Sequence, residues 1–152
     1  MTPFPHQYTA SASATEQGDV AVRSHGLSQM RTDSPPQFGG PSDRWSPETL
    51  LTAAVADCFV LTFRAIARAS NLPWLSLRCD ARGTLDRVER VTKFTHFTLH
   101  VHLEVPEGVD LEQARRLLTA ADHTCLVARS LSATCLLKAN VETVRPAIAA
   151  AG

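Results

Sequence analysis

The residues of this 152-residue chain that are best suited to chemistry are its cysteines, at positions 58, 79, 125 and 135. A cysteine acts as a nucleophile only as its thiolate, which a nearby cation, hydrogen-bond donors or a helix N-terminus can stabilise. Cys58 lies in the middle of a long apolar helical pattern, and Cys125 lies near the predicted start of a short helix. Both are therefore candidates for thiol redox chemistry, with core packing as small hydrophobic side chains as the alternative.

The remaining cysteines, Cys79 and Cys135, fall on the apolar faces of predicted strands, and we expect both to pack in the core. No C-x-x-C pair occurs, which argues against a thioredoxin-type motif or a ribbon-type zinc site. We expect no signal peptide, because no basic stretch followed by an apolar one opens the sequence. A cytoplasmic location follows, in which the thiols are reduced unless they perform redox work.

A carboxylate lies ten residues before the first cysteine, at Glu48. Its position in the first turn of the predicted helix favours a negative charge through the helix dipole, so a purely structural role is the alternative. Ten helical residues advance about 15 Å and leave the two side chains roughly 80° apart around the axis. If Glu48 and Cys58 serve one site, Glu48 must therefore come from a partner chain whose helix runs antiparallel.

Three histidines, His96, His100 and His102, share the polar face of one predicted strand. Such a group could hold a metal ion, but we expect solvated side chains and no metal centre. The triplet His102-Leu103-Glu104 fits the H-x-E part of a zinc deaminase signature. No P-C-x-x-C follows it, which argues against that class of enzyme.

The composition indicates one soluble domain over residues 1–152, with residues 1–5 and 147–152 loose. The chain carries 15 basic and 15 acidic residues, so no basic excess points to a nucleic-acid partner. The apolar run that begins at Leu50 is interrupted by Asp57, Arg64 and Arg68, and we expect no membrane span.

The elements that must position these residues form an α+β pattern with antiparallel hairpins. The central helix begins at Pro47 after an N-cap at Ser46 and stops before Asn71 and Pro73. It is nearly all apolar or small, so we expect it to be covered on most sides. Alternation predicts strands, and Asp110 caps a second helical region that bends at residues 123–124. The predicted strands span 7–15, 20–24, 27–31, 75–81, 97–105 and 135–143, and the second helical region spans 111–121 and 125–131.

The run from Trp45 to Phe59, in which Ser46-Pro47-Glu48 leads to Cys58, resembles the signature of the OsmC/Ohr family of thiol peroxidases. A Gly-Gly-Pro loop at 39–41 and the late second cysteine, Cys125, extend the resemblance over most of the chain. The resemblance implies an OsmC-like α+β fold with antiparallel sheets wrapped around a central helix pair in an intertwined homodimer.

The family's activity is reduction of organic hydroperoxides, of alkyl or fatty-acid type, without a cofactor. The resemblance implies that Cys58 is the peroxidatic thiol, that Cys125 resolves it by disulfide formation and that Glu48 is the family glutamate. An external thiol or a lipoyl protein would then reduce the disulfide. The alternative is a non-catalytic OsmC-like protein that binds a lipid or small molecule in an apolar pocket at the dimer interface.

Members of the family also use an arginine to activate the thiolate, and here the sequence departs from the pattern. One branch places it in the first hairpin turn, which reads Glu16-Gln17-Gly18-Asp19, and the other places it near Phe38. Neither position holds an arginine. The nearest candidates are Arg31 and Arg44, and Arg44 is favoured because it lies just ahead of the helix and could pair with Glu48 at the dimer interface.

Overall fold

The computed structural model describes residues 1–146, so the prediction that residues 147–152 are loose lies outside the described residues. The chain divides into two compact units, Met1–Leu51 and Thr52–Gly152, and each is described by itself. Residues 1–5 are exposed and form no helix or strand.

The first unit contains a small antiparallel sheet of strand order β1-β2-β3. All three strands are shorter than predicted, because the flanking residues turn away from the ladder after only a few pairs. A 3-10 turn, η1, follows the sheet and ends at Gly39, which has a φ of 84°. At Gly40 an added Cβ would lie 1.7 Å from the carbonyl oxygen of Ser34, so only glycine fits there. The elements are β1 (Ser11–Ser13), β2 (Val20–Arg23), β3 (Met30–Thr32) and η1 (Pro36–Phe38).

Helix α1 (Pro47–Ala69) begins in the first unit and continues into the second, as the sequence predicted. Its N-terminus is closed by a reciprocal pair of hydrogen bonds, in which the Thr49 N–H donates to Ser46 Oγ and the Ser46 N–H donates to Thr49 Oγ1. Its C-terminus is closed by Asn71, whose positive φ of 51° lets the Leu72 N–H reach the carbonyl of Ala67. These caps explain why α1 starts and ends where it does.

The second unit contains a sheet of strand order β4-β5-β6, built from β4 (Ser76–Val88), β5 (Val91–Pro106) and β6 (Thr134–Val144). Strands β4 and β5 form a long antiparallel hairpin, turned by Glu89 and Arg90 with φ values of 49° and 70°. Strand β4 thus continues past residue 81, where the predicted strand ends. Gly83 is required in it, since an added Cβ would lie 2.8 Å from the Phe94 and Phe97 rings.

The prediction of wholly antiparallel sheets is wrong for the last strand, because β6 runs parallel to β5. The connection between them consists of α2 (Leu111–Thr124) and α3 (Leu126–Arg129). A helical crossover returns the chain to the end of the sheet from which β5 started, so the next strand must run in the same direction. The α+β class is confirmed, and Asp110 caps α2 as predicted by accepting a hydrogen bond from the Glu112 N–H at 2.9 Å.

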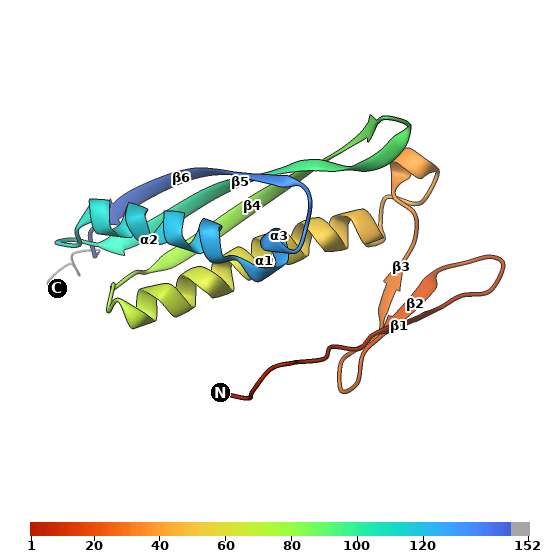
Figure 1. The fold of residues 1–152 in the computed structure, drawn as a ribbon, viewed down its shortest axis with the longest axis horizontal. Helices are drawn as coiled ribbons and strands as arrows, with labels where there is room; N and C mark the ends of the chain where they lie inside the picture. The colour runs from red at the N-terminus through yellow and green to blue at the C-terminus, as the bar shows by residue number, and fades with distance from the viewer. Residues whose placement is uncertain (147–152) are drawn as a thin grey trace, which may run out of the picture. The chain divides into compact units, whose positions relative to one another are not determined.

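The core of the second unit lies between one face of this sheet and the helices that cover it (Figure 1). The alternation predicted for β5 is confirmed, and its inward side chains meet one buried stripe from α1 and one from α2. These buried residues are Phe97, Leu99, Val101, Leu103 and Val105 on β5, Val55, Phe59, Phe63 and Ala67 on α1, and Ala114, Leu118 and Ala121 on α2.

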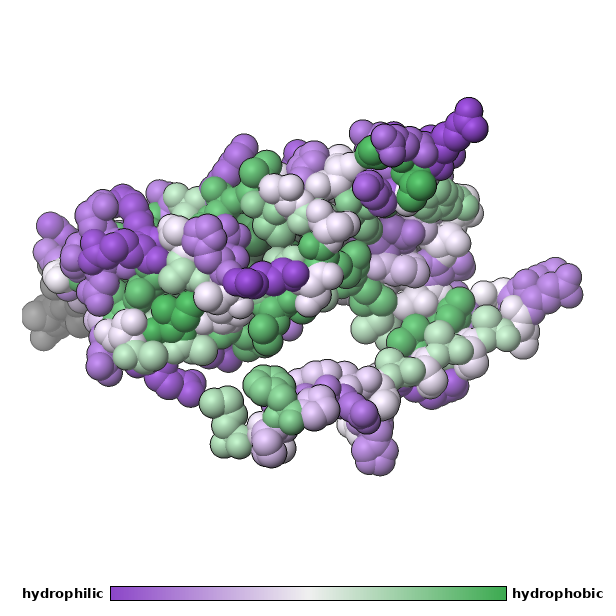
Figure 2. Space-filling view, viewed as in Figure 1, coloured by the Kyte–Doolittle hydropathy of each residue, from purple (hydrophilic) through white to green (hydrophobic). Residues whose placement is uncertain are grey.

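The opposite side of α1 is less covered than the sequence predicted. Only four of its residues are buried, and Leu61 is 49% exposed. Figure 2 shows apolar residues on the visible face of this unit, over α1. Helix α1 is also long and apolar enough to cross a membrane by length and composition alone, a weak criterion that core helices of soluble proteins also meet. One chain therefore covers a single stripe of α1 and leaves apolar surface on the other side.

Candidate active site

The structure brings together the two cysteines that the sequence singled out for chemistry. Cys58 lies on α1 and is half-buried, whereas Cys125 is 1% exposed at the junction where α2 ends and α3 begins. Both are free thiols, and they lie close enough for each to shift the pKa of the other. The junction is held by Arg129, whose guanidinium donates to the carbonyl of His123 at 2.9 Å.

The surroundings of Cys58 supply hydrogen-bond donors to its sulfur. The Val127 N–H, in the first turn of α3, donates to Cys58 Sγ at 3.5 Å. The Thr62 hydroxyl, one helical turn further along α1, lies 3.9 Å from the same sulfur. The side chain of Cys125 and the backbone of Leu126 also lower the pKa of this thiol. Together these groups form a polar cradle in an otherwise apolar region.

These donors decide the ionisation of Cys58. Burial by itself raises the pKa of this thiol, but the hydrogen bonds from Val127, Cys125, Thr62 and Leu126 outweigh it and lower the pKa below its ordinary value. Every one of these groups belongs to the second unit. Cys58 is thus the thiol of the pair that is prepared to ionise.

Cys125 behaves in the opposite way. Burial, and to a lesser extent the neighbouring Cys58, raise its pKa to about 11; the contribution of Cys58 arises because two adjacent thiolates repel each other. A hydrogen bond from the backbone of Ala128 offsets this only in part. The pair therefore shares its protons unequally, because Cys58 loses its proton more readily than Cys125 does.

An apolar groove opens beside the Cys58 sulfur, with a volume of about 590 Å³. Its walls come from the less covered side of α1, including Leu61 and Ile66, and from the α2–α3 junction, including Leu126. Asp57 is the charged residue in its lining. The groove is wide enough for a hydrocarbon group to approach the thiolate from solvent.

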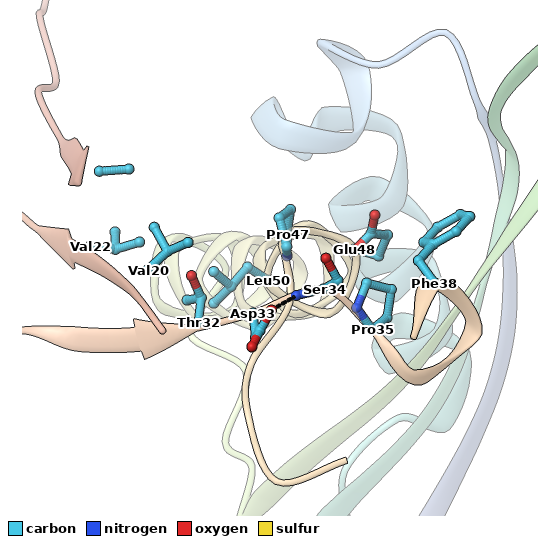
Figure 3. Close-up of a pocket in the computed structure, with 11 residues that line it drawn as sticks. Val20, Val22, Thr32, Asp33, Ser34, Pro35, Phe38, Pro47, Glu48 and Leu50 are labelled. Atoms are coloured by element: carbon cyan, nitrogen blue, oxygen red, sulfur yellow. Dashed lines mark hydrogen bonds between the residues drawn. The ribbon is translucent and has the colours of Figure 1, made fainter. Parts of the chain in front are cut away.

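Glu48 belongs to the first unit, where it lines a separate pocket of about 480 Å³. Figure 3 shows this pocket between residues of β2 and β3, the loop that contains η1 and the first turn of α1. The glutamate is half-buried there, among side chains that are mostly apolar. The predicted association of Glu48 with Cys58 involves a second chain and stays a prediction.

The two arginines proposed as activating cations also lie in the first unit, where both approach one carboxylate. Arg44 Nε is 3.1 Å from Asp19 Oδ2, and Arg31 Nη1 is 3.6 Å from the same oxygen. The hydrogen bond with Asp19 raises the pKa of Arg44 above its ordinary value. The predicted pairing of Arg44 with Glu48 of another chain is likewise untested.

The groups that the sequence analysis missed are the donors to Cys58. Thr62 could have been found, because it follows Cys58 by four residues on the predicted helix and such residues share one face. The Val127 N–H could not, since a backbone amide has no sequence signal and its approach to α1 depends on the tertiary fold.

Comparison with known proteins agrees with this fold. The family model described as OsmC-like protein matches residues 40–140. The uncharacterized protein YmaD of Bacillus subtilis is 22% identical over 129 residues, which cover 83% of this chain and 86% of that protein. The chain belongs to the OsmC-like protein family.

Two solved structures show the likeness of fold. An OsmC-like protein of unknown function from Vibrio cholerae superposes with a TM-score of 0.80 and 18% identity, covering 90% of this chain and 100% of that chain. An organic hydroperoxide resistance protein from Elizabethkingia anophelis superposes with a TM-score of 0.75 and 19% identity, covering 94% of this chain and 100% of that chain. The predicted family and the predicted α+β, OsmC-like fold are confirmed.

Proposed function

We propose that this protein is a thiol-dependent peroxidase that reduces organic hydroperoxides, of alkyl or fatty-acid type, through Cys58 and Cys125. Membership of the OsmC-like family and likeness to an organic hydroperoxide resistance protein support a role in hydroperoxide resistance in general. The observation that carries the specific activity is the thiol pair, in which hydrogen bonds lower the pKa of Cys58 while Cys125 stays protonated beside it.

The proposed reaction uses this unequal sharing of protons. The Cys58 thiolate attacks the distal oxygen of the hydroperoxide, the O–O bond breaks, and Cys58 becomes a sulfenic acid. The departing alkoxide takes the proton of Cys125 and leaves as an alcohol. Cys125, now a thiolate, attacks the sulfenic sulfur, and the hydroxyl group takes up a proton and leaves as water. One hydroperoxide and two thiols thus give one alcohol, one water and one disulfide.

The apolar groove beside Cys58 favours a hydroperoxide that carries an apolar group. Leu61, Ile66 and Leu126 offer apolar surface next to the sulfur, whereas hydrogen peroxide would gain nothing from it. The disulfide must then be reduced by two electrons from an external dithiol or two monothiols, and a lipoyl protein is the reductant suggested by the family resemblance. The chemistry resides in the two sulfurs, and we propose no cofactor.

We further propose that the protein acts as a homodimer, in which helix α1 of one chain places its Glu48 near Cys58 of the other chain. The uncovered apolar side of α1, with Leu61 49% exposed, supports association with a second copy. Glu48 of one chain would then approach Cys58 of the other, and Arg44 or Arg31 would add positive charge. Sedimentation at micromolar concentration tests this proposal, which a monomer would contradict.

The peroxidase proposal is tested by counting thiols before and after one equivalent of cumene hydroperoxide. The protein is expected to lose two thiols per chain, and peptide mapping is expected to place the new disulfide between Cys58 and Cys125. Cys79→Ser serves as the matched control and should lose the same two thiols. No loss of thiols, or a disulfide that contains Cys79 or Cys135, would refute the assignment.

The second candidate function is binding without turnover, and the apolar groove of about 590 Å³ is the observation that favours it. In that case a lipid or other small apolar molecule would occupy the groove at the dimer interface. The protein would then bind a fluorescent fatty-acid analogue and keep all its thiols in hydroperoxide. The same thiol count therefore separates the two functions.

The remaining assignments follow from the same comparisons and composition. We propose a single OsmC-like domain over residues 1–152 in a soluble protein, supported by the family model and by the full coverage of the matched structures. We also propose a cytoplasmic location with no nucleic-acid or membrane partner; the equal numbers of basic and acidic residues, 15 of each, support the absence of a nucleic-acid partner.

A further inference from the structure

The sheet of the second unit carries a polar cluster on the face that points away from its helices. Along β5 the odd-numbered residues from Phe97 to Val105 are buried, so His102 and Glu104 project from the opposite face. On β6 the buried Val141 places its neighbour Glu142 on the same outer face. The three side chains are 38%, 37% and 58% exposed, so solvent and ions reach them.

The ligand atoms of these residues converge on one point. His102 Nε2 lies 3.2 Å from Glu142 Oε2 and 3.9 Å from Glu104 Oε1. One imidazole nitrogen and one oxygen of each carboxylate all fall within 4.8 Å of one another. Two ligands bound about 2.1 Å from a tetrahedral metal ion lie roughly 3.4 Å apart. The cluster therefore needs only small side-chain movements to hold an ion.

The strand register gives a second reason to expect a cation at this position. Glu104 and Glu142 are direct partners across the parallel β5–β6 pair. Like charges directly opposite each other destabilise a strand pair, and a divalent cation between them would reverse that repulsion.

Two further residues hold the ligands in place. The Ser76 hydroxyl donates to Glu104 Oε2 at 2.7 Å, which leaves Oε1 directed toward His102. The amide of Asn140 lies 3.1 Å from His102 Nδ1. Rotation of that amide exchanges its donor and acceptor, so Asn140 can accept a hydrogen bond from Nδ1–H when Nε2 is free to bind a metal. A metal-bound histidine usually donates a hydrogen bond from its other ring nitrogen to an acceptor of this kind.

We propose that His102, Glu104 and Glu142 form a binding site for a divalent first-row transition metal ion. The mixed set of imidazole and carboxylate ligands suits ions such as Mn²⁺ and Zn²⁺, and water completes the coordination. Because the ligands come from β5 and β6, the ion ties together the two strands that α2 and α3 connect. The site lies on the other face of the sheet from the thiol pair, and it does not depend on the peroxidase proposal.

The test is a titration of the full-length protein with Mn²⁺, in which the electron paramagnetic resonance signal of the free ion is measured. Mn²⁺ is the probe because it prefers oxygen and imidazole ligands over thiolates, so the cysteines do not compete. The wild-type protein is expected to remove one ion per chain. His102→Ala and Glu142→Gln are expected to weaken binding by at least about tenfold.

The matched control is His100→Ala, which removes a histidine from the same face of β5 that lies outside the cluster. This variant is expected to bind Mn²⁺ as the wild type does. In addition, Mn²⁺ should raise the thermal unfolding midpoint of the wild type and of His100→Ala, but not that of His102→Ala. The proposal is overturned if the wild type takes up no ion, or if His102→Ala and His100→Ala bind equally well.

Discussion

The four cysteines of this protein fall into two pairs with the same side chain and opposite surroundings. Cys58 and Cys125 meet where α1 passes the α2–α3 junction, beside free backbone N–H groups. Cys79 and Cys135 lie on β4 and β6, whose backbone groups take part in the sheet ladders. Burial and, to a lesser extent, Asp80 raise the pKa of Cys79 to about 11. Burial and, to a lesser extent, Asp122 raise the pKa of Cys135.

The comparison teaches that the supply of donors, more than burial, separates a reactive thiol from an inert one in this fold. Burial is the largest single influence on all four cysteines, and taken by itself it would raise each of their pKa values. Only at Cys58 do hydrogen bonds outweigh it. A helix junction can direct unpaired N–H groups at a neighbouring sulfur, whereas the N–H groups of a strand lie in the plane of the sheet and point away from its side chains.

The largest expected effect comes from removing the reactive member of the first pair. Cys58→Ser should lower hydroperoxide reduction by more than about 10³-fold, because an alcohol at this position is not ionised at neutral pH. Steady-state consumption of cumene hydroperoxide with a dithiol reductant measures the change. Cys135→Ser is the matched substitution in the second pair and should keep its activity. Equal losses in both variants would break the distinction between the pairs.

The next largest effect concerns the other member of the pair, Cys125, as both resolving thiol and hydrogen-bond donor. Cys125→Ala removes the donor and should slow alkylation of Cys58 at neutral pH by about tenfold. Cys125→Ser keeps a donor and should preserve most of that rate. Neither variant should form the disulfide, and both should trap a sulfenic acid that dimedone labels. Equal alkylation of Cys58 in the alanine and serine variants would show that the Cys125 hydrogen bond is unimportant.

A smaller change is expected at Thr62, which contacts the Cys58 sulfur at 3.9 Å. Thr62→Val keeps the shape of the side chain, removes the hydroxyl and should slow alkylation of Cys58 by about threefold at neutral pH. Alkylation of Cys79 in the same sample is the internal control and should not change. A change at Cys79 would mean that the substitution has disturbed the fold, and no change at Cys58 would exclude Thr62 from the cradle.

The smallest effect is expected from the arginines, since Asp19 already neutralises part of their charge. Arg44→Ala is expected to slow alkylation of Cys58 by about twofold, and Arg31→Ala by less, because Arg31 is more exposed and solvent screens its charge more strongly. The same pH-dependent alkylation assay measures both. If either arginine variant slowed alkylation more than Cys125→Ala does, an arginine, and not the hydrogen bonds, would be the main influence on the pKa of Cys58.

Much of the fold could be predicted from the sequence because the signals are local. Ser46 and Pro47 mark the start of α1, Asp110 caps α2, and the alternation from Phe97 to Val105 identifies the buried face of β5. The direction of β6 was mistaken, because strand direction depends on where a connection leads in space and not on the residues of the strand.

The candidate site could be predicted only in part. The two cysteines were identifiable from their positions in helical patterns and from the family signature. What distinguishes Cys58 from Cys125, however, is the Val127 N–H and the contact between the sulfurs, which exist only once α3 has packed against α1. Of the proposed metal ligands, His102 and Glu104 could be placed on one strand face from the sequence His102-Leu103-Glu104. Glu142 joins them only through the β5–β6 register, which the sequence does not reveal.

The central claim is that hydrogen bonds lower the pKa of Cys58 below that of the other cysteines, and the pH dependence of alkylation at individual cysteines tests it most directly. Peptides that carry Cys58 and Cys79 are to be quantified by mass spectrometry after brief iodoacetamide treatment over a range of pH. The rate of alkylation follows the thiolate fraction, which is half-maximal at the pKa, so a lowered pKa shifts the midpoint for Cys58 to lower pH than that of an ordinary cysteine. The account predicts a midpoint for Cys58 below the ordinary value, and one for Cys79 near its raised pKa of about 11. Coincident midpoints, or a midpoint for Cys58 above that of Cys79, would contradict it.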